Sequence, residues 1–164
     1  MIMLSHQHEQ IVYDFDVFLT KAKEMSEQDP PDIVIFSNLI WGAAVICLRK
    51  FFLTRLQLEV SGQHAQEKLR EIVLDTSTDD AIVCESLYSA WTFAKHCRKN
   101  AMRYINKELR NEILLSVADM EAYMNATDIE KIKEKIPTSG LQIKHSQNNV
   151  KIGNCQFSYN KVAY

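Results

Sequence analysis

The sequence has few residues that interrupt helices. Its 164 residues include four glycines and three prolines, and the prolines stand only at positions 30, 31 and 137. Proline inside a helix removes a hydrogen bond and clashes with the preceding turn. Because long segments lack it, this shortage predicts extended helices and an all-α domain.

The four cysteines lack the close spacing of a metal site or a redox motif. No CxxC pair occurs, and three of the four lie in segments that we expect to be helical, on or near apolar faces. They are typical of small buried hydrophobic residues in a reducing compartment. The amino terminus also lacks the basic, apolar and small-residue pattern of a secretory signal. We therefore predict an intracellular, cytoplasmic protein, with the nucleus as an alternative.

The charge balance and the absence of catalytic motifs exclude several function classes. Nineteen basic residues stand against twenty-one acidic ones, which argues against nucleic-acid binding through overall charge but leaves a local basic patch open. No GxSxG motif and no glycine-rich phosphate loop is present, which disfavours acyl transfer and P-loop hydrolysis. We expect no catalytic residue and no cofactor.

Two histidines near the amino terminus have the spacing of metal ligands. His6 and His8 alternate along an expected extended segment, but no third ligand is identifiable. Terminal disorder is the favoured interpretation, so we predict no metal site.

The longest apolar run covers residues 33–53 and has apolar side chains on almost every side. Such a helix must be buried in a bundle, covered by a second subunit or held in lipid. Its uncharged part, residues 33–48, is shorter than the roughly 20 residues needed to cross a bilayer, and it contains Ser37, Asn38 and Gly42. We predict no membrane span.

Apolar spacings of three and four residues predict an up-and-down bundle of four to five long helices with a short sixth helix. The long helices are expected at about residues 8–27, 30–58, 61–75, 79–106 and 108–124, and the short one before Pro137. Residues 1–136 would form this bundle domain. Residues 137–164 instead alternate apolar and polar side chains, which allows a small hairpin or a flexible tail. We favour the tail.

The segment between Phe36 and Tyr104 resembles the HEPN (higher eukaryotes and prokaryotes nucleotide-binding) superfamily. The resemblance rests on SNLIWGAAVICLRKFF, then SGQHAQEKLREIV, then LYSAWTFAKHCRKNAMRYI, and is nearest to a branch of small archaeal proteins. It implies a bundle of four or five helices, frequent homodimers, and relatives that include ribonucleases and inactive binding or scaffold proteins.

The sequence departs from the nuclease members of that superfamily. Those members share an arginine and a histidine separated by four to six residues, usually with a polar residue just after the arginine, and no histidine here follows an arginine at that distance. We therefore carry over no catalytic residue. His64, which matches a histidine in the resemblance, is expected to cap a helix start rather than to act as a base, because no clear partner accompanies it.

The central apolar run has more apolar surface than one core face needs. We expect a non-catalytic interaction module that forms a homodimer or binds another protein through Trp41, Val45, Leu48 and Phe52. Small residues at positions 42–44 would let another helix approach closely. The alternative is that the other helices of the bundle enclose this run completely.

A row of cations supports a second hypothesis, an RNA-binding protein or degenerate ribonuclease. Lys95, Lys99, Arg103 and Lys107 recur every four residues and would line one side of the helix expected at residues 79–106. Such a row can neutralise RNA phosphates. A solvated helix face, with cations favoured near the carboxyl end, is the alternative that the net acidity supports. A small-ligand-binding bundle is a third, less favoured class.

Overall fold

The computed structural model describes residues 12–100, 103–152 and 155–163. It is mostly helical, which confirms the all-α bundle. The helices are α1 (Phe15–Glu27), α2 (Ile33–Leu56), α3 (Gln63–Thr76), α4 (Ala81–Lys99), α5 (Lys107–Ala118), α6 (Met120–Asn125), α7 (Ile129–Lys135) and the short 3₁₀ helix η1 (Ile136–Thr138). The strands are β1 (Leu58–Val60), β2 (Gln142–Ile152) and β3 (Cys155–Ala163).

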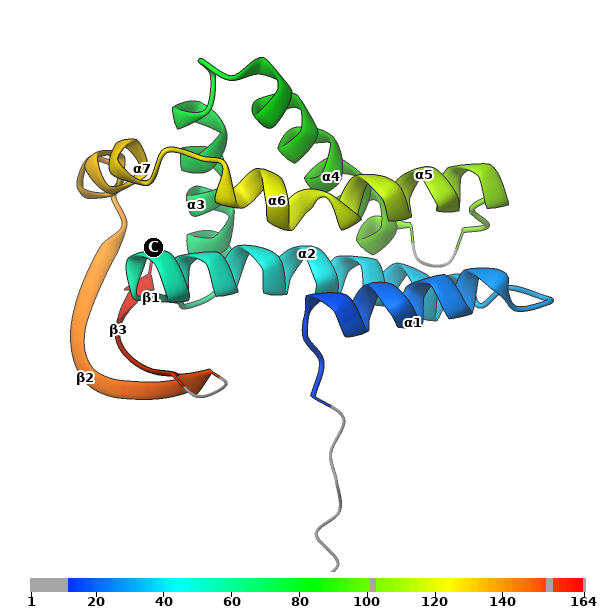
Figure 1. The fold of residues 1–164 in the computed structure, drawn as a ribbon, viewed down its shortest axis with the longest axis horizontal. Coiled ribbons are helices and arrows are strands. Elements are labelled where there is room, and N and C mark those ends of the chain that lie inside the picture. The colour runs from blue at the N-terminus through cyan, green and yellow to red at the C-terminus, as the bar shows by residue number, and fades with distance from the viewer. Residues whose placement is uncertain (1–11, 101–102, 153–154, 164) are drawn as a thin grey trace, which may run out of the picture.

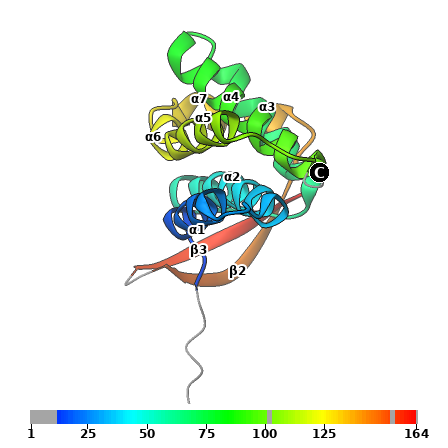
Figure 2. The same cartoon turned by 90° about the vertical axis from the view of Figure 1, so that its right-hand side faces the viewer.

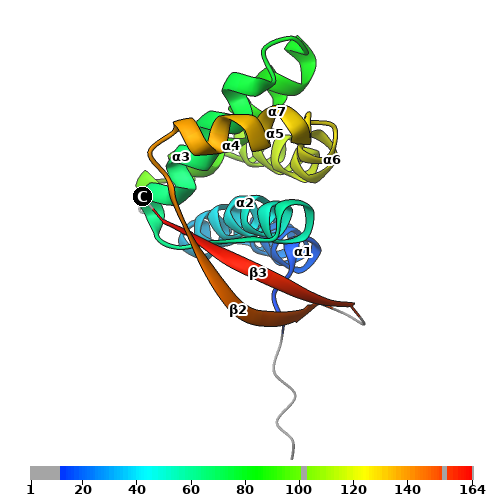
Figure 3. The ribbon, with the colours of Figure 1, turned by 90° about the vertical axis from the view of Figure 1, so that its left-hand side faces the viewer.

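Helix α2 is the centre of the fold. In Figure 1, α1 lies along it, α3 runs across it, and α4, α5 and α6 lie on its other side. Seen from the two ends in Figures 2 and 3, the α1–α2 pair lies between the β2–β3 hairpin and the layer of α4, α5 and α6. Apolar side chains cover most of the circumference of α2 because it is packed on two sides.

Short polar residues start most of the helices. The carboxylate of Asp32 accepts a hydrogen bond from Ile35 N at 3.0 Å and caps α2, and Asp14, Asp80, Asn106 and Asp128 cap other helices in the same way. Such caps satisfy backbone donors that the helix leaves free. The start of α3 differs, because Gly62 holds the cap position with φ of 86° and no side chain caps it.

Two of the predicted long helices end earlier than expected. The fourth was expected to reach residue 106, yet α4 ends at Lys99 and Asn100 follows as its cap. The fifth is divided at Asp119 into α5 and α6. Neither break is marked by glycine or proline, the residues that signal helix ends most strongly.

A glycine lets α1 and α2 approach closely. A Cβ atom placed on Gly42 would overlap Phe18 Cε1 and would lie 2.8 Å from Phe18 Cζ. The Phe18 ring therefore occupies the space that a side chain at position 42 would need. It also contacts the Tyr13 ring, with centroids 5.0 Å apart.

The carboxyl-terminal strands form a hairpin, so the favoured flexible tail was wrong and the hairpin alternative describes the structure. Strand β3 pairs antiparallel with β2 and parallel with β1, in the order β1-β3-β2. Val60 lies opposite Val162, which is fully buried, and Ser61 N donates to Val162 O at 2.8 Å. The boundary expected at residues 136–137 falls inside η1, and that division remains a prediction.

Candidate nucleic-acid interface

The four apolar residues predicted to form a partner-binding surface are not all exposed. Trp41 and Val45 are partly exposed, but Leu48 and Phe52 are fully buried in the core. Leu48 lies among side chains of α3, α4 and α6, around a cavity of about 10 Å³. Enclosure by neighbouring helices, the stated alternative, therefore accounts for half of the predicted surface.

Trp41 lies in an aromatic and cationic cluster between α2 and α4. Its ring centroid is 5.4 Å from that of Trp91, which is buried, and the Arg98 guanidinium carbon lies 4.8 Å from the Trp41 centroid. Arg98 Nη2 also donates to Gln63 Oε1 at 3.3 Å. The indole of Trp41 is thus a partly exposed platform covered by a cation.

The predicted four-residue row of cations is broken. Lys95 and Lys99 belong to α4, Arg103 lies in the loop after it, and Lys107 is the first residue of α5. A single helix through residue 107 would be needed to align all four side chains. Because α4 ends at Lys99, they do not form one helical stripe. They instead follow the carboxyl end of α4, the next loop and the start of α5.

Lys95 differs from the other three because a carboxylate neutralises it. Lys95 Nζ donates to Glu67 Oε2 at 2.9 Å, and Arg70 Nε donates to the same oxygen at 3.3 Å. Burial of the Glu67 carboxyl alone would raise its pKa, but Lys95 and Arg70 outweigh burial and lower the pKa of Glu67 below its ordinary value. This cluster binds α3 to α4 and leaves Lys95 little free charge.

Basic residues are concentrated in a short part of the chain, residues 95–107, which we call the cationic segment. It holds five of the nineteen basic residues and none of the twenty-one acidic ones, so the rest of the chain has fourteen cations against twenty-one acids. Among the described residues, Arg98, Lys99, Arg103 and Lys107 form no ion pair. The positive charge is therefore local despite the net negative charge of the chain.

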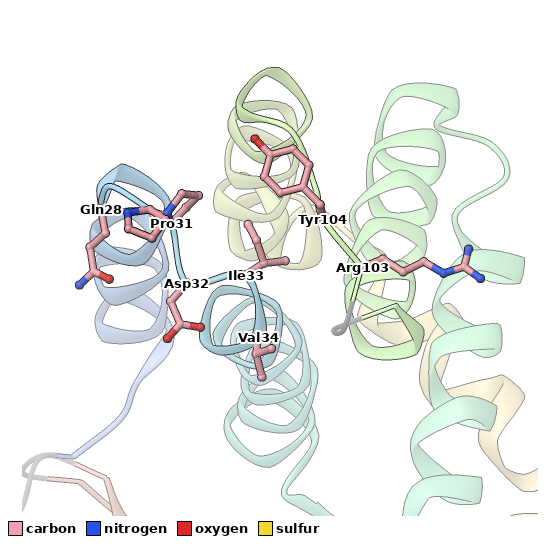
Figure 4. A pocket seen from close by; sticks show the side chains of 8 residues that line it. Gln28, Pro31, Asp32, Ile33, Val34, Arg103 and Tyr104 are labelled. Atoms are coloured by element: carbon pink, nitrogen blue, oxygen red, sulfur yellow. The ribbon is translucent and has the colours of Figure 1, made fainter.

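A shallow pocket of about 500 Å³ adjoins the cationic segment (Figure 4). One wall is the turn between α1 and α2, and the other is the loop before α5. The lining residues are Gln28, Pro30, Pro31, Asp32, Ile33, Val34, Arg103 and Tyr104. The Tyr104 ring is 74% exposed, although an aromatic side chain gains free energy when its apolar surface is covered.

Arg110, three residues after Lys107 in α5, is buried. Its guanidinium donates from Nε to Ser26 Oγ at 2.8 Å, from Nη2 to Ser26 O at 3.1 Å and from Nη1 to Ile105 O at 2.6 Å. None of these acceptors is a carboxylate. Ser26 lies in the last turn of α1, where the negative end of the helix dipole partly offsets the buried charge. Arg110 thus fastens one pocket wall to the other.

The histidines and cysteines form no reactive cluster in the described part of the chain. His64 is exposed at the start of α3 and makes no hydrogen bond with the described residues. Glu67, three residues later in α3, contacts Lys95 and Arg70 instead. Burial raises the pKa of the Cys47 thiol to about 12 and that of Cys97 to about 11, so both stay protonated at neutral pH. His6 and His8 lie outside the described residues, within which no metal-binding group of side chains occurs.

Helix α2 has the length and composition of a membrane span. Core helices also satisfy these two criteria, and ten side chains of α2 are buried within this fold. The absence of a membrane span and the cytoplasmic location remain predictions.

No family model, curated protein or solved structure matches this chain. The resemblance to the HEPN superfamily, and the dimer and binding functions that it implies, therefore remain predictions.

Proposed function

We propose that this chain is a non-catalytic helical domain that binds single-stranded RNA through the cationic segment. The observation that carries the proposal is the set of four cations without carboxylate partners, Arg98, Lys99, Arg103 and Lys107, beside partly or largely exposed aromatic rings. Nucleic-acid affinity depends mainly on cations that displace counterions from phosphates.

The aromatic rings favour a single strand over a duplex. Unpaired bases offer their faces for stacking on aromatic side chains, whereas the bases of a duplex are already stacked on one another. Tyr104 projects from the loop between α4 and α5, and Trp41 lies under Arg98 at the adjoining surface. Because Arg98 covers the Trp41 ring, Tyr104 is the ring available for base stacking, and Arg103 in the same loop can contact a phosphate.

Fluorescence anisotropy with a labelled RNA 12-mer tests the proposal. In a K99E/R103E/K107E variant, affinity should fall, and the slope of log K against log salt should become shallower by about 2, since each lost phosphate contact on a single strand contributes about 0.7. A K131E/K133E/K135E variant in α7 makes the same change in net charge and should bind almost as the parent does. Equal weakening by both variants, or no binding by the parent, would contradict the proposal.

A second function, homodimer formation, is favoured by a groove between α1 and α5. The groove has a volume of about 490 Å³, and its apolar residues are Leu19, Leu114, Leu115 and Ala118. Leu115 is 71% exposed, and a large exposed apolar side chain beside an apolar groove is typical of an interface.

Light scattering tests this second function. The parent should be a dimer, and Leu115→Glu should be a monomer because the charge cannot be buried at the contact. Ile82→Glu changes an equally exposed residue on α4 and should leave the dimer intact. A monomeric parent at high concentration would exclude the groove as a self-association surface.

A further inference from the structure

We infer that the pocket between the α1–α2 turn and residues 103–104 binds one unpaired nucleobase and prefers cytosine to uracil. This inference rests on the proposed RNA binding and assigns a specific role to one part of that surface. In Figure 4, Ile33 lies between Pro31 on one wall and Tyr104 on the other. The walls therefore offer two ring faces above an apolar floor.

The Tyr104 ring supplies the stacking surface. It is 74% exposed, and Val34, which also lines the pocket, is 41% exposed. A base inserted against these side chains would cover apolar surface that is otherwise in water. Stacking of a base on an aromatic side chain contributes about 1–3 kcal/mol.

The side chains of the adjacent residues Arg103 and Tyr104 point in different directions, which suits the two ends of a nucleotide. Tyr104 and Arg103 follow one another in the loop, yet Figure 4 shows the Tyr104 ring directed toward the α1–α2 turn and the Arg103 guanidinium directed away from it. A nucleotide has the same division, with an apolar base at one end and an anionic phosphate at the other. Lys107, four residues further on, extends the cationic side of the arrangement.

Asp32 is the only acidic side chain among the residues that line the pocket, and we expect its carboxylate to set the base preference. Asp32 Oδ1 accepts a hydrogen bond from Ile35 N at 3.0 Å, and the described residues provide no donor for its second oxygen. Cytosine presents an amino donor at position 4, where uracil presents an oxygen acceptor, and acidic side chains accept from that amino group. The pocket should therefore bind cytosine in preference to uracil.

The pocket is formed before any ligand arrives. Arg110 donates to both Ser26 and Ile105, so one buried side chain holds the end of α1 against the loop that carries Tyr104. A site whose walls are already fixed avoids the entropic cost of ordering them on binding. The buried position of Arg110 is thus explained by the geometry of the pocket that it supports.

Tyr104→Ala tests the stacking role in the same anisotropy assay. Affinity for oligocytidine should fall about thirtyfold, which corresponds to the middle of the 1–3 kcal/mol range for one stacked base, while the salt slope stays unchanged. Tyr104→Phe should retain the affinity. Tyr88→Ala removes another exposed tyrosine, 58% exposed on α4, and should have no effect.

Asp32→Asn tests the base preference without removing the helix cap, because asparagine caps helices as well as aspartate does. The parent should bind oligocytidine more tightly than oligouridine, and the variant should lose or reverse this preference because the amide adds a donor. Competition by cytidine monophosphate would show that the pocket accepts a free nucleotide. Failure to compete would show that it requires the strand, provided that Tyr104→Ala weakens RNA binding. If the parent binds RNA and K99E/R103E/K107E weakens it but Tyr104→Ala does not, the inference is wrong and the proposed function stands. If the parent binds no RNA, the proposed function itself is wrong.

Discussion

The Arg98 guanidinium covers the Trp41 indole, with 4.8 Å between the guanidinium carbon and the ring centroid. The two residues come from different helices, α4 and α2, and Gln63 of α3 accepts a hydrogen bond from the same guanidinium. One arginine therefore links three helices at the surface where we propose that RNA binds.

Replacing Arg98 by methionine should uncover the indole. We expect stronger acrylamide quenching of tryptophan fluorescence and a loss of stability of about 0.5–1 kcal/mol, the usual contribution of an exposed cation–π contact. The change can be assigned to Trp41, because the other tryptophan, Trp91, is buried. Lys99→Met serves as the control and should leave quenching unchanged; equal quenching in both variants would argue against the contact.

Replacing Arg110 by methionine should destabilise the whole domain. The substitution removes three charge-assisted hydrogen bonds and leaves Ser26 and Ile105 acceptors without their partner, so we expect a loss of about 3 kcal/mol in urea unfolding. Arg110→Lys should not restore stability, because a single ammonium cannot reproduce the fork of the guanidinium. Arg49→Met, which removes one hydrogen bond from an exposed arginine, should cost less than 1 kcal/mol. Similar losses for positions 49 and 110 would contradict the structural role of Arg110.

Glu67 should make stability depend on pH in the acidic range. Lys95 and Arg70 lower its pKa in the folded protein below the ordinary value of 4.5 in spite of partial burial, so folding favours the charged carboxylate. The stabilisation is present above pH 4.5 and is lost as pH falls through the lower, folded-state pKa. Glu67→Gln should therefore be less stable than the parent at pH 7, and the difference should shrink on acidification. Glu85→Gln, on the exposed side of α4, serves as the control and should be as stable as the parent at pH 7.

Gly42→Ala should destabilise the α1–α2 pair, although alanine is the better helix former. The new methyl group would overlap the Phe18 ring, and the displacement of this ring should cost about 1–3 kcal/mol, more than the roughly 1 kcal/mol gained in helix propensity. In a Phe18→Ala background the same substitution should be neutral or stabilising. A thermal-unfolding double-mutant cycle measures this coupling; stabilisation in both backgrounds would contradict the close contact.

The helices could be predicted because their signals are local. Apolar spacings of three and four residues identify α2 and α4 without knowledge of the fold. The end of α4 at Lys99 could not be predicted, because no glycine or proline marks it. The prediction therefore placed Arg103 and Lys107 on the same helix as Lys95 and Lys99. The sequence therefore predicted one helical stripe, whereas the structure places these cations along the end of α4, a loop and the start of α5.

The features that sequence reasoning missed depend on residues that are distant in the chain. Arg110 is buried because Ser26, 84 residues earlier, accepts its hydrogen bonds. Leu48 is covered by α3, α4 and α6, so its burial depends on how three later helices pack. The pocket likewise depends on distant residues, because Pro31 and Tyr104 line it from segments far apart in the sequence. No periodicity within a single segment reports such contacts.

The parallel pairing of β1 with β3 determines the order in which a newly made molecule can be completed. Val60 leaves the ribosome about a hundred residues before its partner Val162, so the helical layers can assemble while β1 still has an open edge. Until β3 arrives, that edge can accept the equivalent strand of a neighbouring molecule, the exchange known as domain swapping. At high rates of synthesis, the yield of correctly folded chains should therefore depend on how quickly each chain pairs its own β3 with its own β1.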